Sequence, residues 1–331
     1  MHKFNEKELI ETAKKGLALR PEIEKAIDDL WEKGIDRICW LGIGGTWASG
    51  QQAYVHMKEK SSMDIFVENA AEYNYTGNKR INDKTLIIFS SVTGTTSEMV
   101  EAVENIKKIG ATVLGFVDTV NTPLAEASDI CLTAPKNEQL KFFMAADRLM
   151  YHEGCFDEYD DFYSQMDEHF PQIIADAEKS ADEYALAYAK RHAHDDMHYF
   201  VGAGAVYGAT YSYAMCYWEE MHHIRTKSIH AAEVFHGMLE IIYEDTPITV
   251  YVGEDSQREI ALRVVRFLEK VNKNHEVIDS KDIKAEGISD KYRGYIAHHL
   301  IHAVNNRIDI AIEQLTGNDL DIRRYYRKMD Y

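Results

Sequence analysis

The sequence lacks the features that mark secreted, membrane-spanning and thiol-dependent proteins. Its four cysteines are widely scattered and form no CxxC pair, so we expect small core residues in a reduced compartment, the cytoplasm. No apolar run reaches the roughly 18 residues that a membrane-spanning helix needs. Residues 1–15 are polar and mixed in charge, unlike a signal or transit peptide.

Positive charge is also scarce. The chain has 37 Lys and Arg residues against 55 Asp and Glu residues, a formal net charge of −18 at pH 7. A nucleic-acid partner is disfavoured, because phosphate backbones are held by clustered Lys and Arg side chains. A phosphate-bearing small molecule would have to be bound locally, as a helix N-terminus does with neutral backbone N–H groups.

The pattern of apolar residues predicts an α/β protein. The 331 residues, 45% of them hydrophobic, allow one large or two ordinary domains. Short apolar runs alternate with helical stretches, which is typical of parallel sheets wrapped by helices. The expected strands are 37–41, 64–67, 86–90, 112–117, 130–133, 198–201, 248–252 and 276–278. The expected helices include 97–109, 123–127 and 257–271, and residues 138–190 are expected to be mainly helical.

Two similar openings indicate a duplicated fold. Residues 41–50 (LGIGGTWASG) and 201–210 (VGAGAVYGAT) both indicate a strand, a glycine-rich turn and then a helix. The glycines of the second turn, Gly202 and Gly204, are interpreted as structural. The expected divisions are an amphipathic N-terminal helix at 1–30, a first domain at 31–165, a helical connector at 166–194 and a second domain at 195–331.

A run of hydroxyl side chains follows the strand expected at 86–90. Residues 90–97 (SSVTGTTS) place six hydroxyls at a strand-to-helix turn, beside the exposed N–H groups of the next helix. Gly94 would let the backbone approach a ligand closely. An ordinary N-cap, with Thr95 and Glu98 as an imperfect capping box, would need only one or two hydroxyls. The density of hydroxyls therefore favours phosphate binding.

The first glycine turn has a weaker signal. Its sequence, GIGGT, is not GxGxxG, so a dinucleotide site is a weak interpretation. Tight strand-to-helix geometry alone would explain Gly42 and Gly44. Contact of Gly45 and Thr46 with a sugar is equally open on local grounds.

The densest chemistry lies between residues 218 and 237. Carbonyl isomerisation needs a carboxylate base and an acid, both working near neutral pH. Partly shielded Glu and His side chains suit that task. The segment contains three carboxylates and four histidines: Glu219, Glu220, Glu233, His222, His223, His230 and His236.

Two other interpretations of this segment stay open at this point. Three Glu-x-x-His pairs, beginning at Glu219, Glu220 and Glu233, have the spacing of di-iron ligands. Such sites also need carboxylates from further helices of a four-helix bundle, which an α/β pattern does not provide. Alternatively, these residues lie on the solvated face of a helix.

Taken together, the motifs resemble a known family. GIGGT, SSVTGTTSE, the pairing of Glu220 with His236 and the C-terminal tail resemble the double-SIS (sugar isomerase) proteins, which include the isomerase half of glucosamine-6-phosphate synthase. Residues 202–242 and the tail RRYYRKMDY are similar to the fructosamine-6-phosphate deglycases, such as fructoselysine-6-phosphate deglycase. The resemblance covers nearly the whole chain from about residue 30. It implies two SIS subdomains, each a parallel sheet flanked by helices in a flavodoxin-like three-layer sandwich.

The resemblance also implies site residues. The family has a catalytic Glu sixteen residues before a catalytic His, and 236 − 220 = 16, so Glu220 and His236 fit. The substrate-binding positions that it assigns are Gly45, Thr46, Ser91, Thr93, Thr96, Glu233 and Lys328. This chain departs from the family pattern at Val92, Ala232 and Met238, where a polar residue, Gly and Pro are usual.

The implied activity is hydrolysis of a 6-phosphorylated fructosamine to glucose 6-phosphate and a free amine, through an enaminol. Neither a metal nor an organic cofactor is required. Members of the family are usually homodimers or larger, with the His contributed across a subunit interface. The expected partners are therefore a phosphorylated sugar-amine substrate and further copies of the chain.

Two alternatives remain for the function. One is an aldose–ketose phosphosugar isomerase or an isomerising deaminase, which would use the same proton shuttle. The other is a non-catalytic sugar-phosphate sensor. The sensor is disfavoured, because the chain has no basic helix-turn-helix region and retains both Glu220 and His236.

Overall fold

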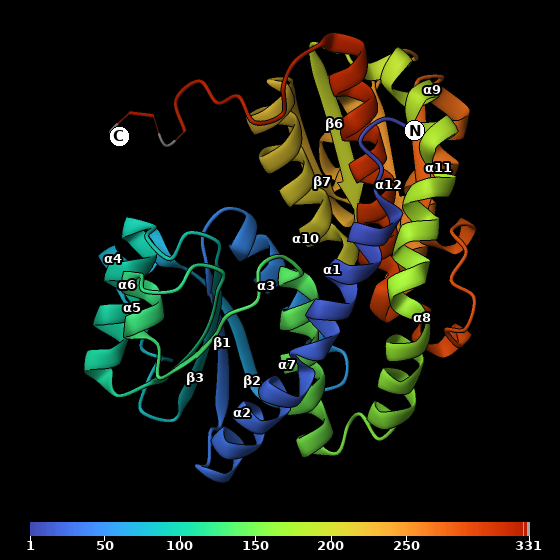
Figure 1. Cartoon of the computed structure of the whole chain (residues 1–331). Coiled ribbons are helices and arrows are strands. Elements are labelled where there is room, and N and C mark those ends of the chain that lie inside the picture. The colour runs from blue at the N-terminus through green and yellow to red at the C-terminus, as the bar shows by residue number, and fades with distance from the viewer. Residues whose placement is uncertain (327, 330–331) are drawn as a thin grey trace. The chain divides into compact units, whose positions relative to one another are not determined.

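The computed structural model describes residues 1–326 and 328–329. They form two compact units, shown in Figure 1. We call residues 11–167 the N-unit, and residues 1–10 together with residues from 168 onward the C-unit. The boundaries fall within two helices, α1 (Glu6–Ala18) and α8 (Tyr159–Ser180).

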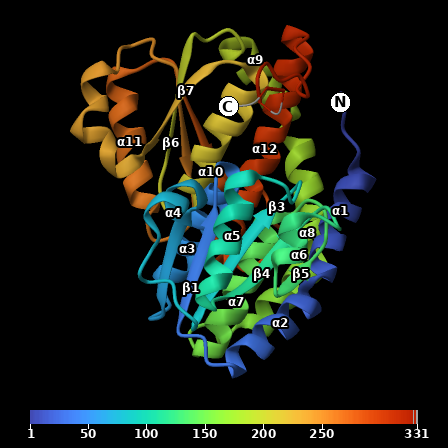
Figure 2. The same ribbon diagram turned by 90° about the vertical axis from the view of Figure 1, so that its left-hand side faces the viewer.

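The N-unit, all of which is described, contains a five-stranded parallel sheet. Its strands are β1 (Arg37–Gly42), β2 (Asp64–Asn69), β3 (Thr85–Ser91), β4 (Thr112–Val117) and β5 (Ile130–Leu132), in the order β2-β1-β3-β4-β5. The five strands expected from the sequence of this half are confirmed. Helices α2 (Arg20–Glu32), α3 (Gly45–Lys58) and α7 (Glu138–Glu153) cover one face. Helices α4 (Ala70–Thr76), α5 (Ser97–Ile109) and α6 (Pro123–Ala127) cover the other face, which is turned to the viewer in Figure 2.

Both faces of this sheet are buried, which explains its continuous apolar strands. Trp40 of β1 packs against Phe142 of α7, with ring centroids 4.9 Å apart. Its neighbours Cys39 and Leu41 point to the opposite face and join the core cluster that contains Val103 of α5. The alternation of side chains along the strand thus fills two apolar layers.

The described residues of the C-unit contain a four-stranded parallel sheet. Its strands are β6 (Met197–Gly202), β7 (Arg225–His230), β8 (Ile248–Val252) and β9 (His275–Asp279), in the order β7-β6-β8-β9. Helix α11 (Arg258–Val271) packs on one face. Helices α9 (Asp182–His192) and α12 (Arg293–Thr316) lie side by side and pack on the other (Figure 1). The expected architecture of two parallel sheets flanked by helices is confirmed.

The segment between β6 and β8 is irregular. Helix α10 (Ala205–Ser212) continues into a π-helix, η1 (Tyr213–His222), which ends at His223 in a left-handed conformation with φ of 60°. Two 3₁₀-helices follow β7: η2 (Ala231–His236) and η3 (Met238–Ile241). Two more, η4 (Ser280–Asp282) and η5 (Asp290–Tyr292), precede α12. Segments of π-helix are rare and often occur at functional sites.

The N-terminal segment differs from its sequence-based expectation. Residues 1–30 were expected to form one helix, but the structure has two. The helix is interrupted at Leu19, and α2 begins with Arg20 and Pro21, because proline is tolerated only in the first turn of a helix. The region 138–190 is helical as expected, divided into α7, α8 and α9. No helix within the described residues is both long enough and apolar enough to cross a membrane.

Candidate functional site

The two loops predicted to bind a sugar phosphate follow neighbouring strands of the N-unit. The glycine turn begins at the last residue of β1, and the hydroxyl loop, residues 90–97, begins at the last two residues of β3. β1 and β3 are paired, but the chain leaves β1 toward β2 on one side and leaves β3 toward β4 on the other. Ligands of open α/β sheets bind at such a switch point, beyond the carboxyl ends of the strands.

Hydrogen bonds fix the hydroxyl loop. The Oγ of buried Ser91 accepts a hydrogen bond from the backbone N–H of Gly94 at 2.9 Å, which leaves the hydroxyl proton of Ser91 for a ligand. Gly94 has a φ of 66°, and a Cβ there would lie 2.0 Å from Oγ1 of Thr122. Glycine is therefore required at this turn.

The N-terminus of α5 is not capped in the ordinary way. Thr96 is its N-cap residue, and in the described structure its side chain accepts no hydrogen bond from the first turn. The hydroxyl of Ser97 donates instead to Oε2 of Glu98 at 2.9 Å. The first-turn N–H groups of this 13-residue helix thus remain available to an anion, which the helix dipole also favours.

The glycine turn has mainly internal contacts. The hydroxyl of Thr46 donates to the carbonyl of Ile43 at 3.0 Å and accepts from the N–H of the same residue at 3.1 Å. Gly44 has a φ of 60°, and a Cβ on Gly42 would lie 2.5 Å from the nitrogen of Trp47. The turn geometry therefore accounts for Gly42 and Gly44, and sugar contact by Gly45 and Thr46 stays a prediction.

Glu138, at the start of α7, is a residue near this edge of the sheet that the sequence reasoning missed. Its Oε1 accepts a hydrogen bond from Ser49 of α3 at 2.5 Å. Burial raises the pKa of the Glu138 carboxyl, although hydrogen bonds from Ser49 and Ser90 oppose the shift. The carboxyl joins the helix of the glycine turn to the first residue of the hydroxyl loop. The sequence gives no local signal for this link, since residues 49, 90 and 138 are far apart in the chain.

The corresponding switch point of the C-unit is filled by the protein itself. The backbone N–H of Ala205, in the first turn of α10, donates to Oδ2 of Asp255 at 2.9 Å. The N–H of Gly204 donates to Oε1 of Gln257 at 3.3 Å. A Cβ on Gly204 would lie 2.0 Å from Oδ2 of Asp255, and one on Gly202 would lie 2.2 Å from Oγ1 of Thr210. The structural interpretation of these two glycines is confirmed.

Glu220 lies in the wall of a pocket in the C-unit. It sits near the end of the π-helix η1, where its Oε1 accepts a hydrogen bond from Nε of Arg323 at 2.7 Å. The pocket has a volume of about 400 Å³. It is lined by Glu219, Glu220, His223, Ile224, Arg225, Arg323, Arg324, Tyr325 and Tyr326.

The neighbouring Glu219 has a structural role. Its Oε1 accepts hydrogen bonds from the hydroxyl of Thr226 at 2.7 Å and from the N–H of the same residue at 3.2 Å. These bonds tie the π-helix to β7. Of the two adjacent carboxylates, Glu220 is thus the one whose side chain pairs with the C-terminal tail.

The histidines of this segment are dispersed. His222 is buried, and its Nε2 is 2.8 Å from Oδ1 of Asp309. Nδ1 of His230 accepts from the N–H of Ala232 at 3.2 Å and so caps η2. His236, at the end of η2, is exposed and is not among the residues that line the Glu220 pocket. Glu233, one turn earlier, is also exposed.

The di-iron alternative is wrong. The Glu-x-x-His pairs lie on a π-helix and a 3₁₀-helix beside a parallel sheet, whereas di-iron ligands come from the facing helices of a four-helix bundle.

Lys328 lies in the tail, beyond the pocket. It is exposed, and its N–H donates to the carbonyl of Tyr325 at 2.8 Å. Residues 327, 330 and 331 of the predicted tail motif lie outside the described residues. A role for Lys328 in ring opening stays a prediction.

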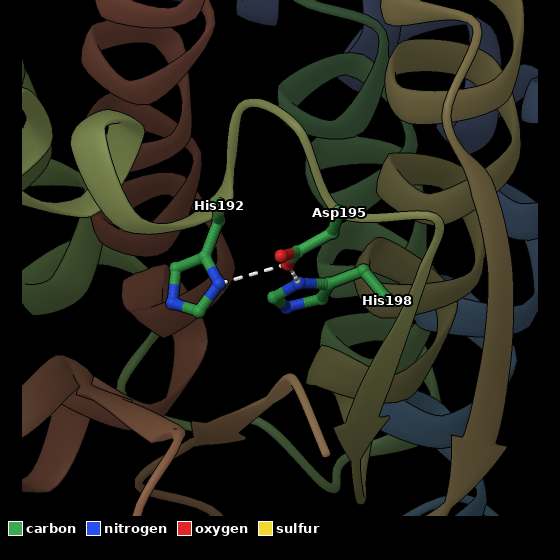
Figure 3. A group of neighbouring side chains, drawn as sticks. All are labelled: His192, Asp195 and His198. Atoms are coloured by element: carbon green, nitrogen blue, oxygen red, sulfur yellow. Dashed lines mark hydrogen bonds and ion pairs between the residues drawn. The ribbon is translucent and has the colours of Figure 1, made fainter. Parts of the chain in front are cut away.

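A separate cluster of titratable groups lies where α9 leads into β6 (Figure 3). Nδ1 of His192 and Nδ1 of His198 each lie 2.8 Å from Oδ2 of Asp195. Nε2 of His198 is 2.8 Å from Oγ1 of Thr249. Burial lowers the pKa of His198 to about 4 despite its bond to Asp195. The group lies at the amino end of β6, opposite the end that bears Gly202 and Gly204, so we assign it a structural role.

The chain resembles known proteins in sequence and in fold. Residues 30–147 match the family model described as the SIS domain. The chain therefore contains a segment that matches an SIS domain. It is 28% identical over 323 residues to the fructosamine deglycase FrlB of Bacillus subtilis (strain 168). The aligned residues cover 94% of this chain and 97% of that protein.

Two further relatives agree. The chain is 20% identical over 312 residues to the fructoselysine 6-phosphate deglycase of Escherichia coli (strain K12), with 92% of this chain and 90% of that protein covered. The crystal structure of a proposed phosphosugar isomerase from Bacillus subtilis matches this protein with a TM-score of 0.88 at 25% identity, covering 94% of this chain and 97% of that one. The protein is therefore an enzyme of the phosphosugar isomerase type.

Proposed function

We propose that this protein is a deglycase, which uses water to cleave a 6-phosphorylated fructosamine into glucose 6-phosphate and a free amine. The observation that carries the proposal is the position of Glu220, a carboxylate in the wall of a 400 Å³ pocket. This is the residue that the family resemblance requires as the base. The names of the two deglycase relatives support the same reaction.

The phosphate of the substrate is proposed to bind at the hydroxyl loop. The hydroxyl proton of Ser91 and the N–H groups in the first turn of α5 are neutral hydrogen-bond donors. They can bind a phosphate locally although the protein as a whole carries a negative net charge. Thr93 and Thr96 are proposed as further contacts, with Gly45 and Thr46 on the sugar side. Holding the phosphate at C6 orients the distant C1, where the reaction takes place.

The proton shuttle is proposed as follows. Glu220 removes a proton from C1 of the open-chain 1-amino-1-deoxyfructose 6-phosphate, and the electron pair forms the C1–C2 double bond of an enaminol. Return of a proton to C2 produces the imine of glucose 6-phosphate. Water adds to that imine, and the C1–N bond breaks to release the amine. His236 acts as the acid toward the sugar oxygen.

The assembly is proposed to be a homodimer or a larger oligomer in the cytoplasm. His236 is exposed and stands outside the wall of the Glu220 pocket, which fits a histidine that serves a site on another copy of the chain. All four cysteines are free thiols, which is consistent with a reduced compartment.

The test is Glu220→Gln, assayed for amine and glucose 6-phosphate release from a panel of 6-phosphofructosyl amines. Loss of the base should lower kcat by roughly 10²–10⁴-fold, with little change in the folded structure of the variant. The matched control is Glu240→Gln, the same change at an exposed position on η3, which should keep wild-type activity.

Deglycation by Glu220→Gln at the wild-type rate would end the proposal. The alternative, isomerisation of an unsubstituted sugar phosphate or deamination of glucosamine 6-phosphate, uses the same shuttle. Turnover of those substrates, without amine release from any 6-phosphofructosyl amine, would establish the alternative instead.

A further inference from the structure

The glycine turn and the hydroxyl loop of the N-unit leave the sheet separately. The pairing of β1 with β3 ends at Trp40 and Ile88. On their other sides, β1 stays paired with β2 as far as Gly42, and β3 stays paired with β4 as far as Ser91. The hydrogen bonds between β1 and β3 therefore do not set the spacing of the two loops, although both are proposed to contact the same sugar phosphate.

The segment that follows β4 holds one side of the hydroxyl loop. The backbone N–H of Asp118 donates to the carbonyl of Ser91 at 3.0 Å. The hydroxyl of Thr119 donates to the carbonyl of Val92 at 2.8 Å. These bonds fix the loop relative to β4 but leave its position relative to the glycine turn undetermined.

Glu138 connects the two loops. Ser90 and Ser91 are adjacent in an extended strand, so their side chains point to opposite faces of the sheet. The buried hydroxyl of Ser90 is bonded to the carboxyl of Glu138. The buried hydroxyl of Ser49 donates to Oε1 of Glu138 at 2.5 Å and lies 3.3 Å from the carbonyl oxygen of Gly45. We call Ser49, Glu138 and Ser90 the Glu138 bridge.

The backbone that leads into Glu138 is strained. Lys136 and Asn137 have φ of 68° and 55°, a left-handed conformation that is uncommon for residues other than glycine and often occurs at functional sites. The N–H of Lys136 donates to Oδ2 of Asp118 at 3.1 Å, and Nδ2 of Asn137 donates to the carbonyl of Thr12 at 2.9 Å. These contacts hold the chain in a conformation that places Glu138 in the first turn of α7.

A carboxyl group is a costly choice for this position. Burial raises the pKa of Glu138, because a low-polarity environment disfavours the ionised form. An apolar side chain would avoid this cost, but it could bond to neither Ser49 nor Ser90. The value of the carboxyl therefore lies in the two bonds that it makes.

We propose that Glu138 is a positioning residue, which sets the spacing between the glycine turn and the hydroxyl loop so that one sugar phosphate can contact both. Ser90 then belongs to the Glu138 bridge rather than to the phosphate contacts. The inference rests on the sugar-phosphate site of the proposed function, because that site takes both loops as substrate contacts.

The experiment compares two probes of different length, inorganic phosphate and glucose 6-phosphate, with Kd measured by titrations followed by ³¹P NMR. Inorganic phosphate can reach only the hydroxyl loop, whereas the sugar phosphate spans both loops. Glu138→Ala should raise the Kd for glucose 6-phosphate roughly ten- to hundredfold, the effect of losing one or two hydrogen bonds on the sugar side. The Kd for inorganic phosphate should stay within about threefold of the wild-type value.

Two further variants test the Glu138 bridge itself. Glu138→Gln keeps an oxygen acceptor and should recover most of the affinity for glucose 6-phosphate. Ser49→Ala breaks the bridge from its other end and should show the same selective rise in Kd as Glu138→Ala. Ser49→Ala therefore keeps the test open if Glu138→Ala does not fold.

The controls separate positioning from a general loss of stability. Glu104→Ala, the same substitution at an exposed position of α5, should change neither Kd. Tyr163→Phe removes a buried hydrogen bond of 2.6 Å to Asp147 and should lower the thermal stability without changing either Kd. A structural role alone for Glu138 would give the same pattern as Tyr163→Phe.

The outcomes for this inference and for the proposed function are distinct. An equal rise in Kd for both probes in Glu138→Ala, or no rise for either, would overturn the positioning role and leave the deglycase proposal standing. Failure of the wild-type enzyme to bind glucose 6-phosphate would overturn the proposed sugar-phosphate site, and the positioning role with it. Binding of glucose 6-phosphate with the expected selectivity, but without amine release from any 6-phosphofructosyl amine, would support the positioning role and overturn the deglycase reaction.

Discussion

At the residue scale, His198 shows how burial sets the charge of a side chain. Its imidazole is bonded to Asp195 and Thr249 inside the C-unit, and its pKa is lowered to about 4 because burial disfavours the charged form. The unfolded chain takes up a proton at His198 near pH 6.5, and the folded chain does so only near pH 4. His198 should therefore stabilise the fold fully above pH 6.5, and this stabilisation should be lost progressively as the pH falls toward 4.

The measurement is urea unfolding of the wild type and of His198→Gln between pH 4 and 8. The wild type should lose about 3 kcal/mol from this group across that window, and the variant should show a correspondingly flatter profile there. His192 behaves in the opposite sense. Although its burial lowers the pKa, bonds to Asp195 and Glu276 raise it overall, so its contribution is lost at higher pH, above the His198 window. Parallel profiles for wild type and variant would contradict the assignment.

The sequence alone does not predict which side chains contact one another when they lie far apart in the chain. The order of apolar and polar residues predicted the strand and the helix on either side of the hydroxyl loop, although β3 extends to Ser91, one residue beyond its expected end. It could not indicate that Asp255 caps Ala205, because the pair is 50 residues apart. Nor could it indicate the pairing of Arg323 with Glu220 across 103 residues. Contacts of this kind depend on how the elements pack, which composition and periodicity do not specify.

At the element scale, Asp309 of α12 holds the π-helix at both ends. Its Oδ1 accepts a hydrogen bond from the hydroxyl of Tyr213 at 2.9 Å and lies 2.8 Å from Nε2 of His222. All three side chains are buried. Replacing Asp309 by Ala should leave the buried imidazole of His222 without this partner and the hydroxyl of Tyr213 with only its 3.4 Å bond to the carbonyl of Asn305, and should lower the free energy of unfolding by about 2–5 kcal/mol.

The same change should displace Glu220, two residues from His222, and lower kcat more than it changes KM for a 6-phosphofructosyl amine. Asp309→Asn keeps one oxygen acceptor and should recover part of both losses, as judged by thermal unfolding and steady-state kinetics. Asp245→Asn, at an exposed position, serves as the control. Full activity and stability in Asp309→Ala would show that the π-helix is held by other contacts.

Elements were predicted well where a strand contains an apolar run. All five strands of the N-unit, together with β6, β8 and β9, follow from their apolar runs. The polar edge strand β7, with the sequence RTKSIH, was missed because one neighbour and a half-exposed surface require few apolar residues. The π-helix was missed because a ten-residue segment with scattered apolar positions does not distinguish one helical period from another.

At the scale of the whole molecule, the exposed His236 predicts complementation between copies. If the histidine serves a partner's site, Glu220→Gln and His236→Asn are each inactive alone, but a mixed dimer contains one site with both native groups. Random mixing of equal amounts should therefore restore about a quarter of wild-type activity. Deglycase activity after co-refolding, together with the mass of the assembly in solution, measures this. Mixtures as inactive as the separate variants would place both groups on the same chain.

The capping of α10 by Asp255 has a consequence for how the duplicated fold is used. One repeat keeps its helix N-terminus open beside a row of hydroxyls, and the other fills the equivalent place with its own carboxylate. A phosphate arriving at the second repeat would meet a negative charge already seated there. Repetition of the fold has therefore not doubled the number of phosphate-binding sites. Each chain should bind one equivalent of phosphosugar.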